Sequence, residues 1–361
     1  MDTSDPDINF DELGVCNYCN DYKLKEEKKL EKRPKTALEL QAIVKQIKRD
    51  GEGRAYDCLM GLSGGVDSSY ATYLLKELGL RTLVVHMDNG WNSELSVMNI
   101  EKILNYCKFD LYTNVLEWNE FRQMQLAYLR AGVLDLEALT DHAINATVFK
   151  AAEKFNIKYI INGSNPKTES ILPLKWRYDE KLTDATNIKS IVRTTSKLEI
   201  KHFPFISLLK YAYLIKVKKI ETIPILEYGV FNKKAAMKVI MEKMDWRDYG
   251  GKHYESVITR FYQGYILPNK FGIDKRKAHL SSLIVCNQLD RSKALEILEQ
   301  PILEDKILES DLEFVPKKLR ITQNEFQDII EGKIRSHYDF KTNKLERKIL
   351  FTLNKILSKF G

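Results

Sequence analysis

Cysteine is scarce in this chain, with five among 361 residues. So few thiols, odd in number, argue against a framework of disulfides. Long apolar runs are also missing: no stretch of about 18 uncharged apolar residues could form a transmembrane helix. The first residues, MDTSDPDINF, are acidic and polar, unlike a signal peptide. These absences predict a cytoplasmic protein that has no membrane partner.

Neither sign of charge dominates the composition. The chain has 57 Lys and Arg against 50 Asp and Glu, a formal net charge of +7. This excess suits an anionic small substrate and does not by itself call for nucleic acid. With 44% hydrophobic residues, the chain can build a sizeable core in one large domain or two ordinary ones.

Apolar runs and helical patterns alternate along the first part of the chain. This alternation predicts βαβ units, and therefore an α/β fold with a doubly wound parallel sheet. Beyond residue 230 the pattern is mostly helical. The expected regions are an N-terminal segment at 1–35, the α/β core at 36–230 and a helical C-terminal region at 231–361. Strands are expected at 56–62, 81–88, 109–115, 157–163 and 221–229, and helices at 36–50, 67–79, 94–107, 119–131, 139–156 and 345–360.

The segment SGGVDSS (63–69) lies between the first predicted strand and the helix that follows it. Doubly wound sheets bind ligands outside the carboxyl ends of their strands. Gly64 and Gly65 let the backbone approach an anion and permit positive φ. Together with the N–H groups at the helix start, they predict a phosphate site. Three hydroxyls add donors: Ser63, Ser68 and Ser69.

Asp67 is the unexpected member of this segment, because a carboxylate repels phosphates. It fits either as the N-cap of the helix or as a ligand of a Mg²⁺ ion that bridges the phosphates. The bland alternative for the whole segment is a tight strand-to-helix turn. The Walker motif GxxxxGK[ST] does not occur in the chain.

SGGVDSS resembles the PP-loop of the N-type ATP pyrophosphatases, which have the adenine nucleotide alpha hydrolase-like fold. This superfamily includes GMP, NAD and asparagine synthetases and tRNA-thiolating enzymes, which cleave ATP between the α and β phosphates. The resemblance implies that residues of 63–69 hold the pyrophosphate end of ATP. It also implies that Met87 and Asp88, after the second strand, meet the adenosine, and that Gly163 in INGSN makes a third contact.

Further phrases, among them MDTSDPDINF, HMDNGWNSE and DWRDYGGKHYES, resemble the N-acetyl sugar amidotransferase family over residues 1 to about 340. Members act in lipopolysaccharide O-antigen and pseudaminic or legionaminic acid pathways. The resemblance implies that the oxygen of a sugar acetamido group attacks the α-phosphorus of ATP and forms an O-adenylyl imidate. Ammonia then displaces AMP and leaves an acetamidine. The sugar is nucleotide-linked or a nonulosonate.

Ammonia is expected from another protein. An N-terminal nucleophile glutaminase would need Cys, Ser or Thr where this chain has Asp2, and a Cys–His–Glu glutaminase would need about 200 further residues. The family resemblance implies a separate glutaminase subunit, like that of imidazole glycerol phosphate synthase, and a cyclase-like third subunit as a further candidate.

Basic groups that neutralise pyrophosphate are expected from the segment 252–279. By analogy with asparagine synthetase, Lys270 and Arg276 are the first candidates and Lys252 the next. Glu169 is a candidate for sugar or metal contact. The alternative for each is an ordinary solvated surface residue. The segment's other basic residues are His253, Arg260, Lys275 and His279.

CNYC places Cys16 and Cys19 at the spacing of half a tetrahedral zinc site. The family pattern has a second CxxC upstream that this chain lacks, so we expect an incomplete zinc site.

Two other functions remain open. A tRNA-thiolating enzyme would share the PP-loop and explain the CxxC, but it would need an RNA-binding module. A non-catalytic nucleotide-binding module would share the fold alone.

Overall fold

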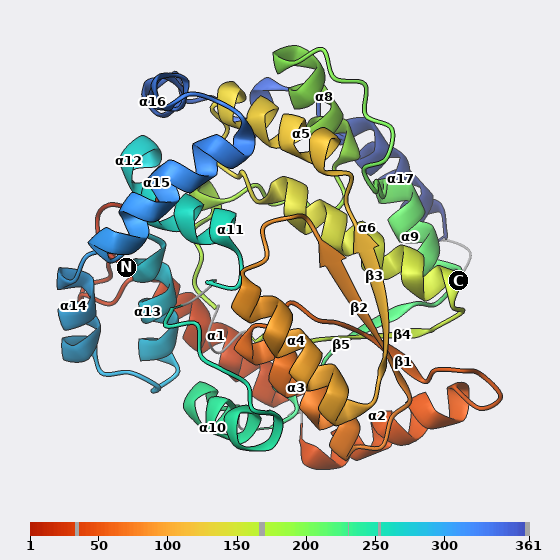
Figure 1. The fold of residues 1–361 in the computed structure, drawn as a ribbon. Coiled ribbons are helices and arrows are strands. Elements are labelled where there is room, and N and C mark those ends of the chain that lie inside the picture. The colour runs from red at the N-terminus through yellow and green to blue at the C-terminus, as the bar shows by residue number, and fades with distance from the viewer. Residues whose placement is uncertain (33–35, 166–169, 230, 252–253, 358–361) are drawn as a thin grey trace.

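The computed structural model describes residues 1–32, 36–165, 170–229, 231–251 and 254–357. Its strands, shown in Figure 1, are β1 (Cys58–Gly61), β2 (Thr82–Asp88), β3 (Asp110–Val115), β4 (Tyr159–Asn162) and β5 (Glu221–Pro224). Its helices are α1 (Asn17–Lys32), α2 (Ala37–Asp50), α3 (Val66–Glu77), α4 (Glu94–Cys107), α5 (Trp118–Ala131), α6 (Ala138–Lys154), α8 (Ala185–Thr195), α9 (Leu208–Lys216), α10 (Lys233–Met244), α11 (Val257–Phe261), α12 (Leu267–Phe271), α13 (Lys275–Val285), α14 (Arg291–Glu299), α15 (Asp305–Leu319), α16 (Gln323–Glu331) and α17 (Lys344–Leu357). Short helical turns are η1 (Leu174–Trp176), η2 (Ile225–Glu227), η3 (Tyr262–Ile266) and η4 (His337–Asp339).

The sheet has the strand order β3-β2-β1-β4-β5, and each pair of neighbours is parallel. The chain builds the sheet outward from β1 in one direction and then from β4 in the other. The order therefore reverses between β1 and β4, which creates a crevice at their carboxyl ends. The predicted doubly wound α/β fold with a helical C-terminal region is confirmed.

Both faces of β1 are buried, because successive side chains of a strand point to opposite faces. Leu59 packs with Ala146 and Phe149 of α6. Its neighbour Met60 packs on the other face with Ala71 and Leu75 of α3. Helices on the two sides thus enclose the sheet between them (Figure 1).

The two edges of the sheet differ. At one edge, β3 leaves Leu111 44% and Val115 67% exposed. At the other, β5 ends at Pro224, earlier than the predicted strand 221–229. Proline has no N–H to donate to a sheet, and the chain turns into η2 directly after it.

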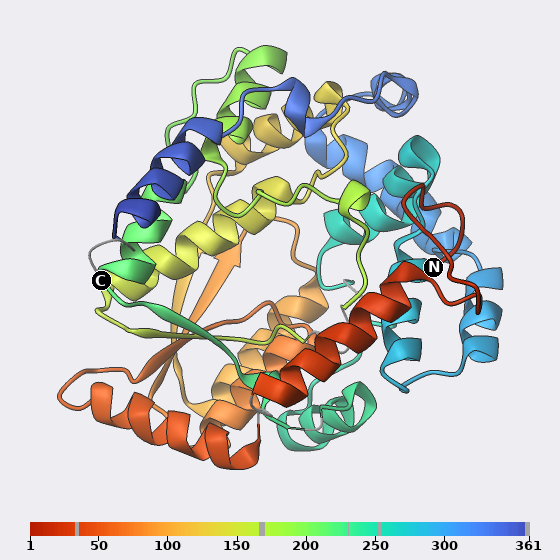
Figure 2. The same ribbon diagram turned by 180° about the vertical axis from the view of Figure 1, so that it is seen from behind.

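The N-terminal segment lies against the C-terminal helices (Figure 2). Asp2 forms an ion pair of 2.8 Å with Lys277 of α13, and the Sγ of Cys286 lies 3.2 Å from the Tyr22 hydroxyl. Helix α1 begins at Asn17, within the N-terminal segment, for which no helix was predicted. In the part of the chain described, no helix is both long and apolar enough to cross a bilayer.

Two buried histidines are held in the neutral form. The Nε2 atom of His142 accepts a hydrogen bond from the Ile206 N–H at 3.2 Å, and that of His337 accepts one from the Asp135 N–H at 3.2 Å. A proton on either Nε2 would break this bond. Burial, above all, lowers the pKa of both side chains to about 4.

The free energy of unfolding should therefore fall as the pH decreases from about 6.5 to about 4, because the unfolded chain binds these two protons at higher pH. Above pH 6.5 the two groups should contribute no pH dependence. Urea titrations at several pH values, with the imidazole resonances followed by NMR, would measure this. Imidazoles that titrate near 6.5 would contradict the assignment.

Candidate active site

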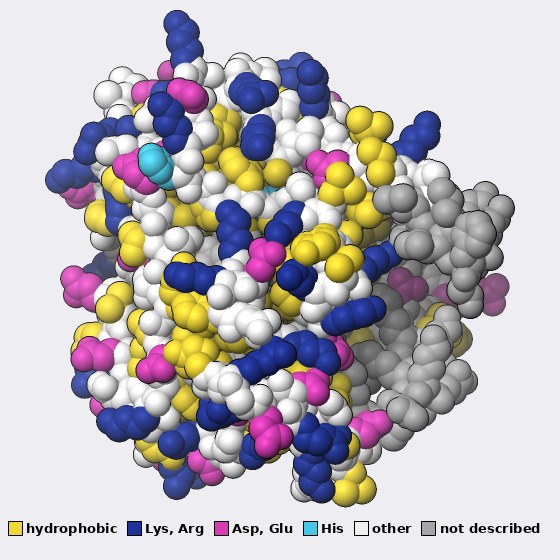
Figure 3. Space-filling view, turned by 90° about the vertical axis from the view of Figure 1, so that its right-hand side faces the viewer, with side chains coloured by type: hydrophobic (Ala, Val, Ile, Leu, Met, Phe, Trp, Pro, Cys, Tyr) yellow, Lys and Arg dark blue, Asp and Glu magenta, His cyan; other side chains and the backbone are white. Residues whose placement is uncertain are grey.

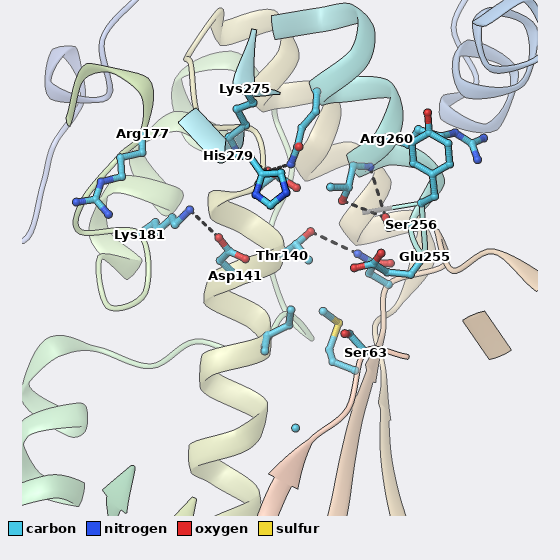
Figure 4. Close-up of a pocket in the computed structure, with 18 of the residues that line it drawn as sticks. Ser63, Thr140, Asp141, Arg177, Lys181, Glu255, Ser256, Arg260, Lys275 and His279 are labelled. Carbon is cyan, nitrogen blue, oxygen red and sulfur yellow. Dashed lines mark hydrogen bonds and ion pairs between the residues drawn. The ribbon is translucent and has the colours of Figure 1, made fainter. Parts of the chain in front are cut away.

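A cavity of about 1150 Å³ opens at the carboxyl ends of β1, β2 and β4. Leu62, Met87 and Asn162 line the part next to the sheet. The other walls come from helix α6 and from the segments 171–182, 250–251 and 254–303. Figure 4 shows that residues from these separate parts of the chain face the same space. The cavity thus occupies the crevice where strand order reverses, and the C-terminal region helps to enclose it.

Residues 63–69, here called the phosphate loop, begin at the cavity wall with Ser63. The hydroxyls of Ser63 and Ser68 lie 3.1 Å apart. The Ser63 N–H donates to the Ser68 hydroxyl, and the Gly65 N–H donates to the Ser63 hydroxyl, each at a distance of 3.4 Å. Gly64 has a φ of +85°, which favours glycine. The loop therefore gathers N–H and hydroxyl groups, as an anion site requires.

The carbonyl groups of Leu62, Ser63 and Gly64 accept hydrogen bonds from side chains of β2, α3, α4 and the segment after α10. The Leu62 carbonyl accepts from Nδ1 of His86 at 2.8 Å, and the Ser63 carbonyl accepts from the Ser96 hydroxyl at 3.1 Å. The Gly64 carbonyl accepts three bonds, from Trp246 Nε1 (2.9 Å), the Tyr249 hydroxyl (2.8 Å) and the Ser69 hydroxyl (3.1 Å). Ser69, the last residue of the loop, is buried, and its hydroxyl helps to hold the Gly64 carbonyl in place.

Asp67 is not the N-cap of α3. The helix begins at Val66 with Gly65 as its N-cap, so Asp67 lies within the first turn. A carboxylate there is favoured by the helix dipole. Its predicted role as a Mg²⁺ ligand stays a prediction.

Of the two predicted adenosine contacts at the end of β2, Met87 lines the cavity and Asp88 does not. Asp88 accepts hydrogen bonds from the Gly90 N–H at 2.8 Å and the Asn92 amide at 3.3 Å, and so shapes the turn after β2. Gly163 packs against the start of α3: a Cβ added there would lie 3.0 Å from the backbone of Asp67. It therefore permits close approach of β4 and the phosphate loop.

Lys270 lies elsewhere, and its predicted place at the phosphates is wrong. Its Nζ donates to the carbonyls of Ile329 (2.6 Å), Ile330 (3.2 Å) and Gly332 (2.8 Å), at the C-terminal end of α16. Burial lowers its pKa. Lys270 satisfies carbonyls that a helix leaves without intrahelical partners.

Arg276 does line the cavity, but its guanidinium is engaged in structure. It bonds to Asp274 at 2.8 Å and to the Gln300 carbonyl at 2.8 Å, so it ties the segment after α14 to α13. Arg260 likewise lines the cavity and pairs with buried Asp311 at 2.6 Å. The remaining candidates of this group, Lys252, His253 and Glu169, lie outside the described residues.

The end of the cavity away from the phosphate loop is lined by paired charges, of which sequence reasoning identified only Lys275, as one of the basic residues of segment 252–279. Lys181 forms an ion pair of 2.7 Å with Asp141, and Lys275 forms one of 3.3 Å with Glu137 (Figure 4). Burial alone would lower the pKa of Lys181, but the nearby carboxylates of Asp141 and Asp135 outweigh this effect and raise the pKa. His279 lies beside Lys275 and faces the same space. This end can therefore receive a polar ligand.

Cys16 and Cys19 lie with their Sγ atoms 3.4 Å apart. Burial, above all, raises the pKa of the Cys19 thiol to about 11. Within the described ranges, no third His, Cys, Asp or Glu joins the two thiols as a metal-binding group. The residues present do not fit a zinc ion.

Replacing Lys270 by Ala should lower the free energy of unfolding by about 1–3 kcal/mol, because charged hydrogen bonds to three carbonyls are lost. ATP affinity should not change. Urea denaturation and calorimetric titration with ATP would measure the two effects. A large loss of ATP affinity in a folded variant would restore Lys270 to the site.

Replacing Gly163 by Ala should weaken ATP binding at least tenfold, because the new Cβ displaces the Asp67 backbone and with it the phosphate loop. Gly229→Ala is the matched control, since a Cβ there meets nothing within 4 Å. Equal ATP affinities of the two variants would refute the packing argument.

Two family models match parts of the chain. Residues 255–355 match "LPS biosynthesis protein WbpG-like, C-terminal domain", and residues 57–114 match "tRNA methyl transferase HUP domain". The first match begins at Glu255 in the cavity wall, and the second contains the phosphate loop.

Known proteins give more distant matches. A tRNA(Ile)-lysidine synthase from Chlamydia pneumoniae is 35% identical over 92 residues, which are 22% of this chain and 28% of that protein. The chain thus spans little more than a quarter of this relative. An NMN synthetase structure from Francisella tularensis has 14% identity and a TM-score of 0.29, covering 54% of this chain and 75% of its own.

An NH3-dependent NAD synthetase from Campylobacter jejuni subsp. jejuni NCTC 11168 has 11% identity and a TM-score of 0.34, covering 75% of this chain and 93% of its own. Assignment therefore rests on the sequence matches together with the phosphate loop and the sheet order. The matches, the phosphate loop and the sheet order together support the PP-loop ATP pyrophosphatase superfamily, and residues 255–355 are similar to a WbpG-like C-terminal domain.

Proposed function

We propose that the protein is an ATP-dependent amidotransferase that converts the acetamido group of a sugar into an acetamidino group, in the synthesis of a bacterial surface polysaccharide. One observation carries the proposal: a single cavity joins the phosphate loop to a polar end lined by charged pairs. The WbpG-like domain supplies walls of this cavity, and the description of that family names lipopolysaccharide biosynthesis.

The chemistry requires both ends of the cavity. An amide oxygen is a poor leaving group, and transfer of AMP to it makes it a good one. The acetamido oxygen attacks the α-phosphorus while pyrophosphate departs; ammonia then adds to the carbon, and AMP leaves with that oxygen. The N–H groups and hydroxyls of the phosphate loop suit the charge that develops on pyrophosphate. Mg²⁺, which Asp67 would hold, neutralises phosphate charge when bound.

The polar end suits the acceptor. Its two ion pairs supply hydrogen-bond donors and acceptors, which can exchange their present partners for the hydroxyl and acetamido groups of a sugar. The donors are Lys181 and Lys275, and the acceptors are Asp141 and Glu137. Helices α6 and α13 line this end of the cavity, and exclusion of water from it during the reaction would protect an activated imidate from hydrolysis.

Ammonia is proposed to come from a separate glutaminase subunit, and a cyclase-like subunit is a further candidate partner. This part of the proposal follows from the family resemblance alone.

Action on tRNA is the second candidate, favoured by the match to a tRNA(Ile)-lysidine synthase. On the face shown in Figure 3, Lys and Arg side chains gather across the middle beside hydrophobic ones, which suits an anionic ligand of either kind. We keep the sugar acceptor as the proposal because the WbpG-like match includes a wall of the cavity.

Release of AMP tests the proposal. With ATP, Mg²⁺ and an ammonium salt, the pure chain should form AMP only when an acetamido sugar is added, and glutamine should not replace ammonium. Asp67→Ala and Ser63→Ala should each lower the rate by about 100-fold or more while the fold persists. Asp290→Ala, at the exposed start of α14, is the matched control.

Other outcomes would decide against the sugar acceptor. Formation of AMP that depends on tRNA would favour the second candidate. Nucleotide binding without turnover on any acceptor would favour a non-catalytic module. Use of glutamine by the pure chain would contradict the separate glutaminase.

A further inference from the structure

Three successive carbonyl groups, where β1 leads into the phosphate loop, are each held by a hydrogen bond from a side chain. The carbonyls of Leu62, Ser63 and Gly64 accept hydrogen bonds from His86, from Ser96, and from Trp246 with Tyr249 and Ser69, respectively. These donors come from β2, α4, α3 and the segment after α10. Nothing in the proposed chemistry requires them to touch a substrate.

Fixing a carbonyl also fixes the N–H of the next residue. A trans peptide is planar, so its C=O and N–H point in opposite directions. Since the Gly64 carbonyl points at Trp246 and Tyr249, the Gly65 N–H must point the other way. It is indeed directed at the Ser63 hydroxyl, which lies on the cavity side. The Ser63 N–H, opposite the bond from His86, is directed at the Ser68 hydroxyl in the same manner.

The two aromatic donors are themselves rigidly placed. Trp246 is 2% exposed and packs with Ile100 and Ile103 of α4. Between Trp246 and Tyr249, the backbone of Arg247 exchanges two hydrogen bonds with the Asn99 side chain, at 2.8 and 2.9 Å. Burial raises the pKa of Tyr249 to about 12, so its hydroxyl stays a donor at neutral pH.

The same segment continues into the cavity wall. Gly250, Gly251 and Glu255 line the cavity, and the Glu255 carbonyl accepts from the Ser93 N–H at 2.9 Å. A Cβ added to Gly65 would lie 3.4 Å from a Glu255 carboxylate oxygen. Trp246 and Tyr249 therefore contact the phosphate loop at the Gly64 carbonyl, and Glu255 approaches it at Gly65.

We propose that Trp246 and Tyr249 are positioning residues, which hold the Gly64 carbonyl away from the cavity so that the loop N–H groups face the departing pyrophosphate. This inference rests on the proposed use of ATP. It assigns to the segment that precedes the WbpG-like domain the task of shaping a loop about 180 residues earlier in the sequence.

The test compares Tyr249→Phe with wild type. This substitution removes one donor and keeps the ring, and the Gly64 carbonyl retains Trp246 and Ser69 as partners, so the melting temperature should change little. Dissociation constants for ATP and for inorganic pyrophosphate should rise about tenfold, as expected when one loop-fixing hydrogen bond is lost. Tyr106→Phe, on α4, is the matched control, since its ring contacts Tyr73 and not the loop.

A second variant, Trp246→Phe combined with Tyr249→Phe, should weaken pyrophosphate binding about 100-fold. If this double variant does not fold, Tyr249→Phe alone decides. Michaelis constants for the acceptor sugar should stay unchanged in both, because the polar end of the cavity is built by other elements. A merely structural role would instead lower the melting temperature and affect both substrates alike.

The possible failures are distinct. Tyr249→Phe protein that binds pyrophosphate as tightly as wild type would overturn the positioning role and leave the proposed function standing. Wild-type protein that binds neither ATP nor pyrophosphate would overturn the proposed function and the positioning role together.

Discussion

The position of one central strand determines where the chemistry of this protein lies. β1 is buried on both faces and pairs with β2 on one side and β4 on the other. Because the order of strands reverses beside it, the chain must leave β1 at the crevice of the sheet. The residues that follow are those of the phosphate loop, so burial of Leu59 and Met60 places this loop at the crevice. The cavity, its C-terminal wall and the outward-held carbonyls all depend on this placement.

Features decided by neighbours in the sequence were predictable. The helix expected at 94–107 matches α4 from end to end, since Ser93 caps it locally. The strand–helix rhythm predicted a parallel sheet, and SGGVDSS predicted a loop rich in donors at the end of the first strand. Asp67 shows the limit of this approach. Whether a residue is the N-cap or lies in the first turn depends on a shift of two positions, and Gly65 took the cap.

Features decided by packing were not predictable. Lys270 and Arg276 have the charge that phosphates need, but a long side chain bonds to whatever its fold brings within reach. Here the nearest acceptors are the end of α16 and the segment after α14. The reverse holds for Trp246 and Tyr249, which look like ordinary core aromatics until their polar atoms meet Gly64. His86 differs from them, because a histidine within the apolar run of β2 already indicates that its ring nitrogens need polar partners, and one of these is the Leu62 carbonyl.

The two edges of the sheet differ in how readily a strand of another molecule could add to them. A strand that adds to a sheet needs a row of open N–H and carbonyl groups. β5 has only four residues and ends in proline, so it offers a poor template for such growth. β3 is longer, and two of its large apolar side chains face solvent. Aggregation through strand addition would therefore start at β3, on the side of the sheet opposite to β5.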